Sequence, residues 1–250
     1  MDLYVVTGAS RGLGRAIAEQ LLAPGRELLT IARKPDRALD AAAAANGAGL
    51  EQWALDLAHD VATAARLEAW LRAQPPARFA TATLINNAGL IGKVGPIDAS
   101  DAETLAAVLR VGLEAPMLLA SAFLRATRDW TAQRRVLNVS SGAARRPIAG
   151  WAAYCAAKAG LDQFSRVTAL DEQRRPNPAR IVALAPGVID TDMQGELRAA
   201  DRSGFPDLEQ FKQLKDTGQL ATAEATAARV LAFLARADFG NHPVADLRDA

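Results

Sequence analysis

The sequence has few of the side chains on which several classes of enzyme depend. Its 250 residues include one cysteine, two histidines and two tyrosines. Cys155 alone allows no internal disulfide bond, which is compatible with a reducing compartment. With only His59 and His242 beside it, the chain has too few ligands for a Cys/His zinc site. Neither histidine lies near a nucleophile elbow, so no Ser-His-Asp hydrolase is predicted, and we expect no metal site.

Excess charge and long hydrophobic runs are also absent. The net charge is +1, from 29 basic and 28 acidic residues, so no overall field attracts nucleic acid or anionic lipid. The first residues, MDLYVVTGAS, lack the basic region and long apolar stretch of a signal peptide. No run approaches the roughly 20 apolar residues of a membrane span. We therefore expect a cytoplasmic protein without nucleic-acid or membrane partners.

Short apolar segments alternate with helical patterns along the whole chain. The expected strands are residues 3–7, 27–32, 50–55, 83–85, 135–139, 180–185 and 244–247. The expected helices are residues 14–23, 38–45, 61–73, 102–127, 152–171 and 223–235, with a distortion at Pro116, and residues 190–218 are expected to be irregular. Such alternation predicts βαβ units around a parallel sheet. Since no linker divides the chain, we expect one doubly wound α/β domain over residues 1–250, with helices on both faces.

A glycine-rich segment, TGASRGLG at residues 7–14, lies between the first expected strand and the first expected helix. Glycine tolerates positive φ and lets a phosphate approach the backbone, and a helix N-terminus favours negative charge. Ordinary turns also use glycine, so the loop alone is a weak signal. Its position after a strand and before an amphipathic helix strengthens the prediction of a dinucleotide site.

The TGxxxGxG spacing, together with NNAG at residues 86–89, resembles the short-chain dehydrogenase/reductase family. The resemblance covers essentially the whole chain. It implies a Rossmann fold and hydride transfer between NAD(H) or NADP(H) and a carbonyl carbon. The candidate cofactor residues are Gly8, Ser10, Arg11, Gly12, Leu13, Gly14, Arg33, Lys34, Asp56, Leu57, Asn87, Ala88, Gly89, Tyr154, Lys158, Pro186, Gly187, Val188 and Thr191.

The residues after the second expected strand bear on the choice of cofactor. NAD-preferring folds place an acidic residue there to hold the ribose 2′-hydroxyl, whereas this chain has Ala32 followed by Arg33 and Lys34. Together with Arg11, these bases would neutralise a 2′-phosphate. Simple solvated charges at a strand end are the alternative. We expect NADP(H).

Ser141, Tyr154 and Lys158 are the candidate catalytic residues. Tyr154 and Lys158 are four apart on an expected helix and so share one face. With Ser141 at the end of the fifth strand, this YxxxK pattern resembles the catalytic signature of the family. We expect Lys158 and an oxidised nicotinamide to lower the phenol pKa, which is ordinarily about 10, so that Tyr154 exchanges a proton with substrate. Ser141 would hydrogen-bond the carbonyl oxygen, and the resemblance implies that Lys158 also holds the nicotinamide ribose. A core tyrosine beside a surface lysine is the alternative.

The resemblance fails at one position. The family's catalytic set adds an Asn on the long helix before the fifth strand, and Gly112 stands where that Asn is usual. We expect Gly112 and Pro116 to preserve the helix distortion, so that the enzyme works with a catalytic triad.

Residues 190–218 are expected to form a substrate lid. Apolar candidates for its lining are Met193, Leu197, Phe205, Leu208, Phe211 and Leu214. Residues 239–249 resemble the tail of the branch that includes sepiapterin and benzil reductases, in which Asp246 would bind the substrate; a simple cap or ion pair is the alternative. The substrate candidates are thus Trp151, Met193 and Asp246, whereas Arg145 and Arg146 are expected to be solvated loop charges.

The sequence thus predicts NADP(H)-dependent reduction of a small-molecule ketone or diketone. An NAD-dependent secondary-alcohol dehydrogenase and a non-catalytic regulator that senses a dinucleotide remain the alternatives. The helical patterns at 102–127 and 152–171 resemble the family's dimerising pair, which implies a homodimer or homotetramer.

Overall fold

A computed structural model describes residues 1–59, 62–198, 201–202 and 204–249. Within them, seven parallel strands form one sheet in the order β3-β2-β1-β4-β5-β6-β7. The strands are β1 (Asp2–Thr7), β2 (Arg26–Ala32), β3 (Gly49–Ala54), β4 (Thr81–Asn86), β5 (Gln133–Val139), β6 (Arg180–Ala185) and β7 (Val244–Asp246). The chain winds outward from β1 to β3 and then returns to β4 on the other side of β1. The expected doubly wound fold is confirmed, with its strand order reversing between β1 and β4.

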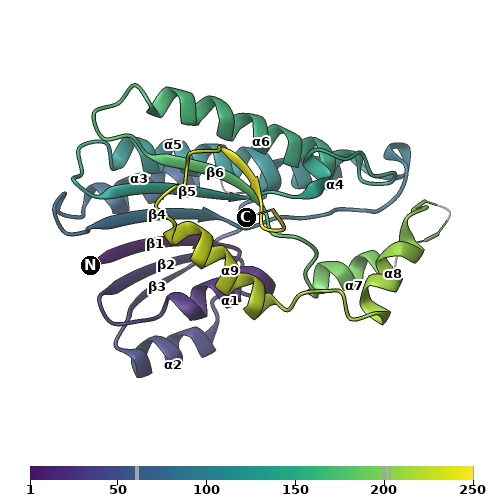
Figure 1. Cartoon of the computed structure of the whole chain (residues 1–250), viewed down its shortest axis with the longest axis horizontal. Coiled ribbons are helices and arrows are strands. Elements are labelled where there is room, and N and C mark those ends of the chain that lie inside the picture. The colour runs from purple at the N-terminus through teal and green to yellow at the C-terminus, as the bar shows by residue number, and fades with distance from the viewer. Residues whose placement is uncertain (60–61, 199–200, 203, 250) are drawn as a thin grey trace.

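Helices cover both faces of this sheet (Figure 1). They are α1 (Gly12–Leu21), α2 (Arg37–Asn46), α3 (Ala62–Arg72), α4 (Ala102–Leu109), α5 (Ala115–Ala126), α6 (Ala152–Glu172), α7 (Asp192–Arg198), α8 (Leu208–Asp216) and α9 (Ala223–Ala235). Helices α1, α2 and α9 lie on one face and α3 to α6 on the other, while α7 and α8 extend beyond the carboxyl ends of the strands. Val61, which we expected to begin the third helix, lies outside the described residues.

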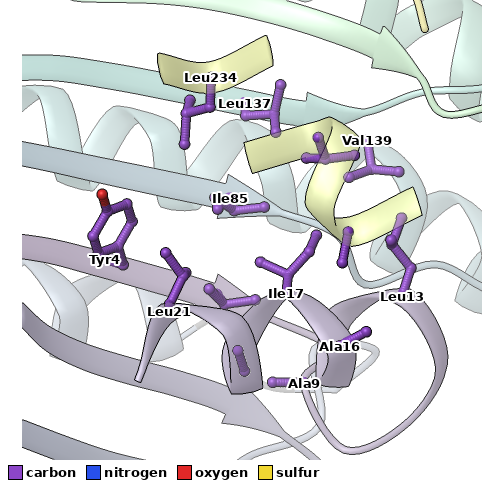
Figure 2. Close-up of a cluster of buried hydrophobic side chains, with 14 of the residues drawn as sticks. Tyr4, Ala9, Leu13, Ala16, Ile17, Leu21, Ile85, Leu137, Val139 and Leu234 are labelled. Carbon is purple, nitrogen blue, oxygen red and sulfur yellow. The ribbon is translucent and has the colours of Figure 1, made fainter. Parts of the chain in front are cut away.

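The hydrophobic core has one layer on each side of the sheet because successive strand residues point to opposite faces. Tyr4 packs with Ile17 and Leu21 of α1 and with Leu234 of α9 (Figure 2). Val5, its neighbour in the strand, belongs to the opposite layer, among side chains of α3 and α5. Burial on both faces explains why the central strands are continuous apolar segments in the sequence.

The long helical region before β5 contains the distortion expected at Pro116. Helix α4 passes through a π-helical turn, Arg110–Glu114, into α5. Pro116 has no N–H to offer the carbonyl of Gly112, four residues earlier, so the regular ladder is interrupted there. Among the described residues, one helix, Ala102–Ala126, is long and apolar enough to cross a membrane. Half of its most apolar window is buried within the protein, where α5 packs against α3, as a core helix does.

Our expectation of irregular structure at residues 190–218 was wrong, because this segment contains α7 and α8. Both helices are short, with seven and nine residues, and helices of this length have little stability of their own. Tertiary packing supports them instead: Phe205 and Phe211 are buried against Trp151. Residues 199, 200 and 203 of the expected lid lie outside the described residues.

Candidate active site

A cleft of about 740 Å³ opens at the carboxyl ends of the strands. Residues at or just after the end of each of the seven strands line it, as expected at the point where the strand order reverses. Every predicted catalytic, cofactor and substrate residue lines this cleft except Gly14 and Lys34. Of the apolar candidates for the lid lining, Phe205 and Leu208 are buried and do not line it. The fold therefore brings together motifs that lie far apart in the sequence.

The glycine-rich loop forms one wall of the cleft by packing closely on the segment that follows β4. Gly8 has a φ of +71°, and a Cβ there would lie 2.9 Å from the Cα of Ala88. A Cβ on Gly14 would lie 2.3 Å from the carbonyl oxygen of Gly8, so this glycine is needed for the packing of α1 against the loop. Gly12, with a φ of +53°, faces Thr191.

Asn87 links the carboxyl ends of the neighbouring strands β1 and β4. Its backbone N–H and that of Ala88 both donate to Oγ1 of Thr7, over 3.0 Å. Its side-chain Nδ2 donates to the carbonyl oxygen of Thr7, also over 3.0 Å. The NNAG motif thus holds the two neighbouring strand ends together at the edge of the cleft.

Ser141, Tyr154 and Lys158 meet at the centre of the cleft. Lys158 is buried and its Nζ donates a hydrogen bond to the carbonyl oxygen of Val139, at the end of β5, over 2.7 Å. The same Nζ lies 5.6 Å from the ring centroid of Tyr154. Ser141 hydrogen-bonds Tyr154, and its Oγ also accepts from the N–H of Ala143 over 3.2 Å.

Burial controls the ionisation of these groups. It raises the pKa of Tyr154, and the hydrogen bond with Ser141 only partly opposes this effect. It lowers the pKa of Lys158 to about 8, with Asp162 acting in the opposite direction. In the chain alone burial dominates the pKa of Tyr154, and the lowering that we expect from Lys158 together with an oxidised nicotinamide stays a prediction. The phenol therefore stays protonated near neutral pH.

Sequence reasoning missed a buried polar network behind the lysine. Asp162, one helical turn beyond Lys158, accepts a hydrogen bond from Oγ of Ser140. Nearby, Asn138 accepts from Asn86 over 2.9 Å and donates to Ser165 over 2.9 Å. The repetition of Tyr154, Lys158 and Asp162 at intervals of four was the available signal, since such residues share one helix face.

A model of the short chain dehydrogenase family matches residues 3–202. The chain belongs to this family. It is therefore an oxidoreductase, and the family uses nicotinamide dinucleotides.

Relatives within the family agree with this assignment. The chain is 34% identical over 241 residues to a benzil reductase ((S)-benzoin forming) of Bacillus cereus, covering 96% of each chain. It is 35% identical over 258 residues to a sepiapterin reductase of Meriones unguiculatus, covering 98% of this chain and 95% of the relative. A short chain dehydrogenase from Burkholderia cenocepacia J2315, solved in complex with NADP, superposes with a TM-score of 0.77 at 25% identity, covering 98% of this chain and 94% of that one.

Gly112, at the position where the family resemblance implies Asn, lies in the π-helical turn and packs on α6. A Cβ on Gly112 would lie 3.1 Å from the Cβ of Ala157, the residue before Lys158. A Cβ on Gly160 would likewise lie 2.9 Å from Leu113. The two segments are therefore so close that a side chain at position 112 requires Ala157 to give way by a few tenths of an ångström.

An aromatic cluster supports the catalytic tyrosine candidate at the other end of the cleft. The ring of Trp151 lies edge-on to Tyr154, with centroids 5.6 Å apart, and stacks on Phe205 at 5.5 Å. Phe211 is 5.4 Å away. Trp151 thus both packs against Tyr154 and, like Met193, lines the cleft.

Charged residues in and around the cleft differ in how fully they are paired. Arg11 lies 3.3 Å from a carboxylate oxygen of Asp192, whereas Arg33 is exposed and has no ion pair within the described part of the chain. Arg145 is exposed, as we expected of a solvated loop charge, but it also donates to Asp246 over 3.3 Å. Arg146 is exposed and lines the cleft.

Replacing Asp162 tests whether its carboxylate keeps Lys158 charged. Asp162→Asn removes the group that raises the lysine pKa against burial. A lysine is charged below its pKa, so the pH above which dinucleotide binding weakens should fall from about 8 by about one unit. The measurement is a fluorescence titration with NADPH between about pH 6 and 9. Asp171→Asn, an exposed change on the same helix, is the control, and an unchanged midpoint in Asp162→Asn would contradict the assignment.

Restoring the family residue at position 112 tests the triad. Because its Cβ would meet Ala157, Gly112→Asn should lower the free energy of unfolding by about 1–2 kcal/mol and should not raise turnover. Urea denaturation and steady-state kinetics measure the two effects. Gly195→Asn is the matched control, since a Cβ at this helical glycine meets nothing within 4 Å. A gain in turnover of orders of magnitude would show that Gly112 impairs the natural enzyme.

Proposed function

We propose that the chain is an NADP(H)-dependent reductase of ketones or diketones, with Tyr154 as the proton donor. The observation that carries this proposal is the juxtaposition of a buried, protonated phenol, the Ser141 hydroxyl and the Lys158 ammonium at the centre of the cleft. The printed activities of the two relatives, a benzil reductase and a sepiapterin reductase, support a carbonyl substrate.

The cleft walls fit a dinucleotide. Gly8 and Gly12 have positive φ and leave their side of the loop without a Cβ, so phosphates can approach the backbone N–H groups at the start of α1. Across the cleft, a Cβ on Gly187 would meet nothing within 4 Å, which leaves room beside the following residues Val188 and Thr191. Asp56 and Leu57, after β3, line the end expected to receive the adenine.

Each catalytic residue has a distinct task in the proposed reaction. When bound, the reduced nicotinamide supplies the hydride that forms the new C–H bond at the carbonyl carbon. Ser141 donates a hydrogen bond to the carbonyl oxygen as the C=O electron pair moves onto it. Tyr154 then gives its proton to this oxygen, which completes the alcohol. Lys158 stabilises the phenolate that remains until a proton from solvent replaces the one donated.

The charge around Arg33 supports NADP(H) over NAD(H). The position where NAD-preferring folds have an acidic residue is occupied by Ala32. The nearest acidic residue along the chain, Asp36, accepts from Arg15 over 2.7 Å and from the N–H of Ala38, so its carboxylate is already engaged. Arg33 has no such partner among the described residues and lines the cleft. The NADP-bound structural relative is consistent with this choice.

Other roles fit less well. An NAD-dependent alcohol dehydrogenase would share the triad but lacks an acid after β2. A regulator that only senses a dinucleotide has no need of a buried phenol beside an ammonium group.

A specific observation favours self-association: α4, α5 and α6 expose Leu109, Met117, Val167 and Leu170. We propose a homodimer or homotetramer formed through this face, acting in the cytoplasm, with the segment that contains α7 and α8 as a lid.

Removing the phenol oxygen tests the catalytic assignment. Tyr154→Phe should lower kcat for a diketone such as benzil by about a hundredfold or more, because the proton donor is lost, and should leave NADPH binding nearly intact. NADPH absorbance and a fluorescence titration measure the two quantities. Tyr4→Phe makes the same change in the sheet core and should retain activity. A Tyr154→Phe enzyme of normal turnover would refute the mechanism.

Removing the unpaired guanidinium tests the cofactor assignment. Arg33→Ala should weaken NADPH binding by about tenfold or more and NADH binding far less, since only NADPH carries the 2′-phosphate. Dissociation constants for both cofactors give the comparison. Arg174→Ala, an exposed change outside the cleft, serves as control, and equal losses for the two cofactors would exclude a 2′-phosphate contact at Arg33.

A further inference from the structure

The carboxylate of Asp246, at the end of β7, lines the cleft and is held by two guanidinium groups. Its side chain is only 3% exposed. Arg248 binds this carboxylate through two hydrogen bonds, with Nε donating to Oδ1 over 2.9 Å and Nη2 donating to Oδ2 over 2.7 Å. The backbone N–H of Arg248 donates to Oδ1 over 3.0 Å, and Arg145 donates to Oδ2 over 3.3 Å. Each carboxylate oxygen thus accepts two hydrogen bonds.

This arrangement changes what the end of β7 offers a ligand. The two guanidiniums hold the pKa of Asp246 below its usual range, and their combined charge exceeds that of the carboxylate. A carboxylate oxygen with both acceptor positions occupied has little capacity left for donors on a substrate. Asp246 is therefore a positioning residue for arginine, and the group presented to the cleft is Arg248.

The guanidinium of Arg248 lies beside the loop that contains Ser141. It lines the cleft, and its Nη2 is 4.0 Å from where a Cβ on Gly142 would lie. Because Nε and one N–H of Nη2 are directed at Asp246, the edge formed by Nη1 and the second N–H of Nη2 remains for another acceptor. Its side chain is 65% exposed, yet the fork on Asp246 restrains it, which reduces the entropy lost on binding an anion.

The other charges along the described cleft wall reinforce a positive substrate end. The acidic residues that line it, besides Asp246, are Asp56 and Asp192. Asp56 follows β3 on the far side of the sheet and accepts from the N–H of Ala58, while Asp192 pairs with Arg11. Arg146 adds a further positive charge to the wall. Trp151, Phe211 and Met193 give the same cleft apolar surfaces.

We propose that Arg248, positioned by Asp246, binds a carboxylate next to the reacting ketone, so that the chain reduces aromatic 2-oxo acids. In such a compound the carboxylate replaces the second carbonyl of a diketone, and the aromatic group meets the apolar wall. The reaction is otherwise that of the proposed function, on which this inference rests. The hydride adds to the ketone carbon, Tyr154 protonates the oxygen, NADPH becomes NADP⁺, and the carboxylate leaves unchanged as part of a 2-hydroxy acid.

A pair of substrates that differ only in charge tests the proposal. Benzoylformate and its methyl ester share the same ketone, and the natural enzyme should have the higher kcat/KM for the acid. Arg248→Ala should lower the acid-to-ester ratio of kcat/KM by about tenfold or more, the loss typical of one charge-assisted contact. Arg248→Lys should give an intermediate ratio, because lysine keeps the charge without the fork.

The chain itself provides a matched control. Arg236 grips Asp238 through the same two atoms, Nε and Nη2, both over 2.8 Å, and neither residue lines the cleft. Arg236→Ala should leave the acid-to-ester ratio unchanged. A measurement on the natural enzyme avoids any folding defect: raising salt from about 0.05 to 0.5 M at saturating NADPH should lower kcat/KM for the acid more than for the ester.

The outcomes separate this inference from the proposed function. If the natural enzyme consumes no NADPH with benzil, the ester or the acid, the proposed function itself is wrong. If it reduces the neutral compounds but prefers the ester, the role of Arg248 is overturned while the reductase assignment stands. The role of Arg248 would also be overturned if neither Arg248→Ala nor salt altered the acid-to-ester ratio of kcat/KM.

Discussion

The ammonium group of Lys158 donates to the carbonyl oxygen of Val139 over 2.7 Å, which ties the middle of α6 to the end of β5. This bond fixes the rotation and height of the helix against the sheet. Tyr154, one turn earlier, is thereby directed toward Ser141, which follows the same strand. Because the ammonium is buried, its pKa falls to about 8, and among the described residues the carbonyl of Val139 and the carboxylate of Asp162 offset its lost hydration. The geometry and the ionisation of the candidate catalytic residues thus depend on one contact between helix and strand.

The same demand for buried polar partners shapes the rest of the cleft. Asn86 and Asn138, at the ends of neighbouring strands, bond to each other over 2.9 Å, and Ser165 of α6 accepts from Asn138. Asp246 is buried within a fork of arginine donors. These bonds form among the chain's own residues, so the site is arranged before any ligand binds, which limits the reorganisation that catalysis requires. In our proposals, specificity depends on Arg33 for the cofactor and on Arg248 for the substrate, because both guanidiniums keep unused donors among the described residues.

The sequence predicts those parts of the site that depend on interactions between residues close together in the chain. The central strands are recognisable because both their faces are buried, and the distortion near Gly112 because Pro116 lacks an N–H. The candidate catalytic pair, Tyr154 and Lys158, is predictable from a spacing of one helical turn. By contrast, the pairing of Arg145 with Asp246 joins residues 101 positions apart, and no local pattern indicates which distant charges meet. Helices α7 and α8 were missed for the same reason, since packing on Trp151 rather than intrinsic propensity supports them.

The central claim is that a hydride passes from a nicotinamide cofactor to a carbonyl carbon while the protein supplies the proton. Isotope transfer tests this claim most directly. With NADPH dideuterated at C4 of the nicotinamide and benzil as substrate in ordinary water, mass spectrometry and NMR should find one deuterium in the benzoin, on the carbinol carbon. Its hydroxyl hydrogen should come from the protein and solvent. Benzoin without deuterium on that carbon, or no benzoin at all, would contradict the account.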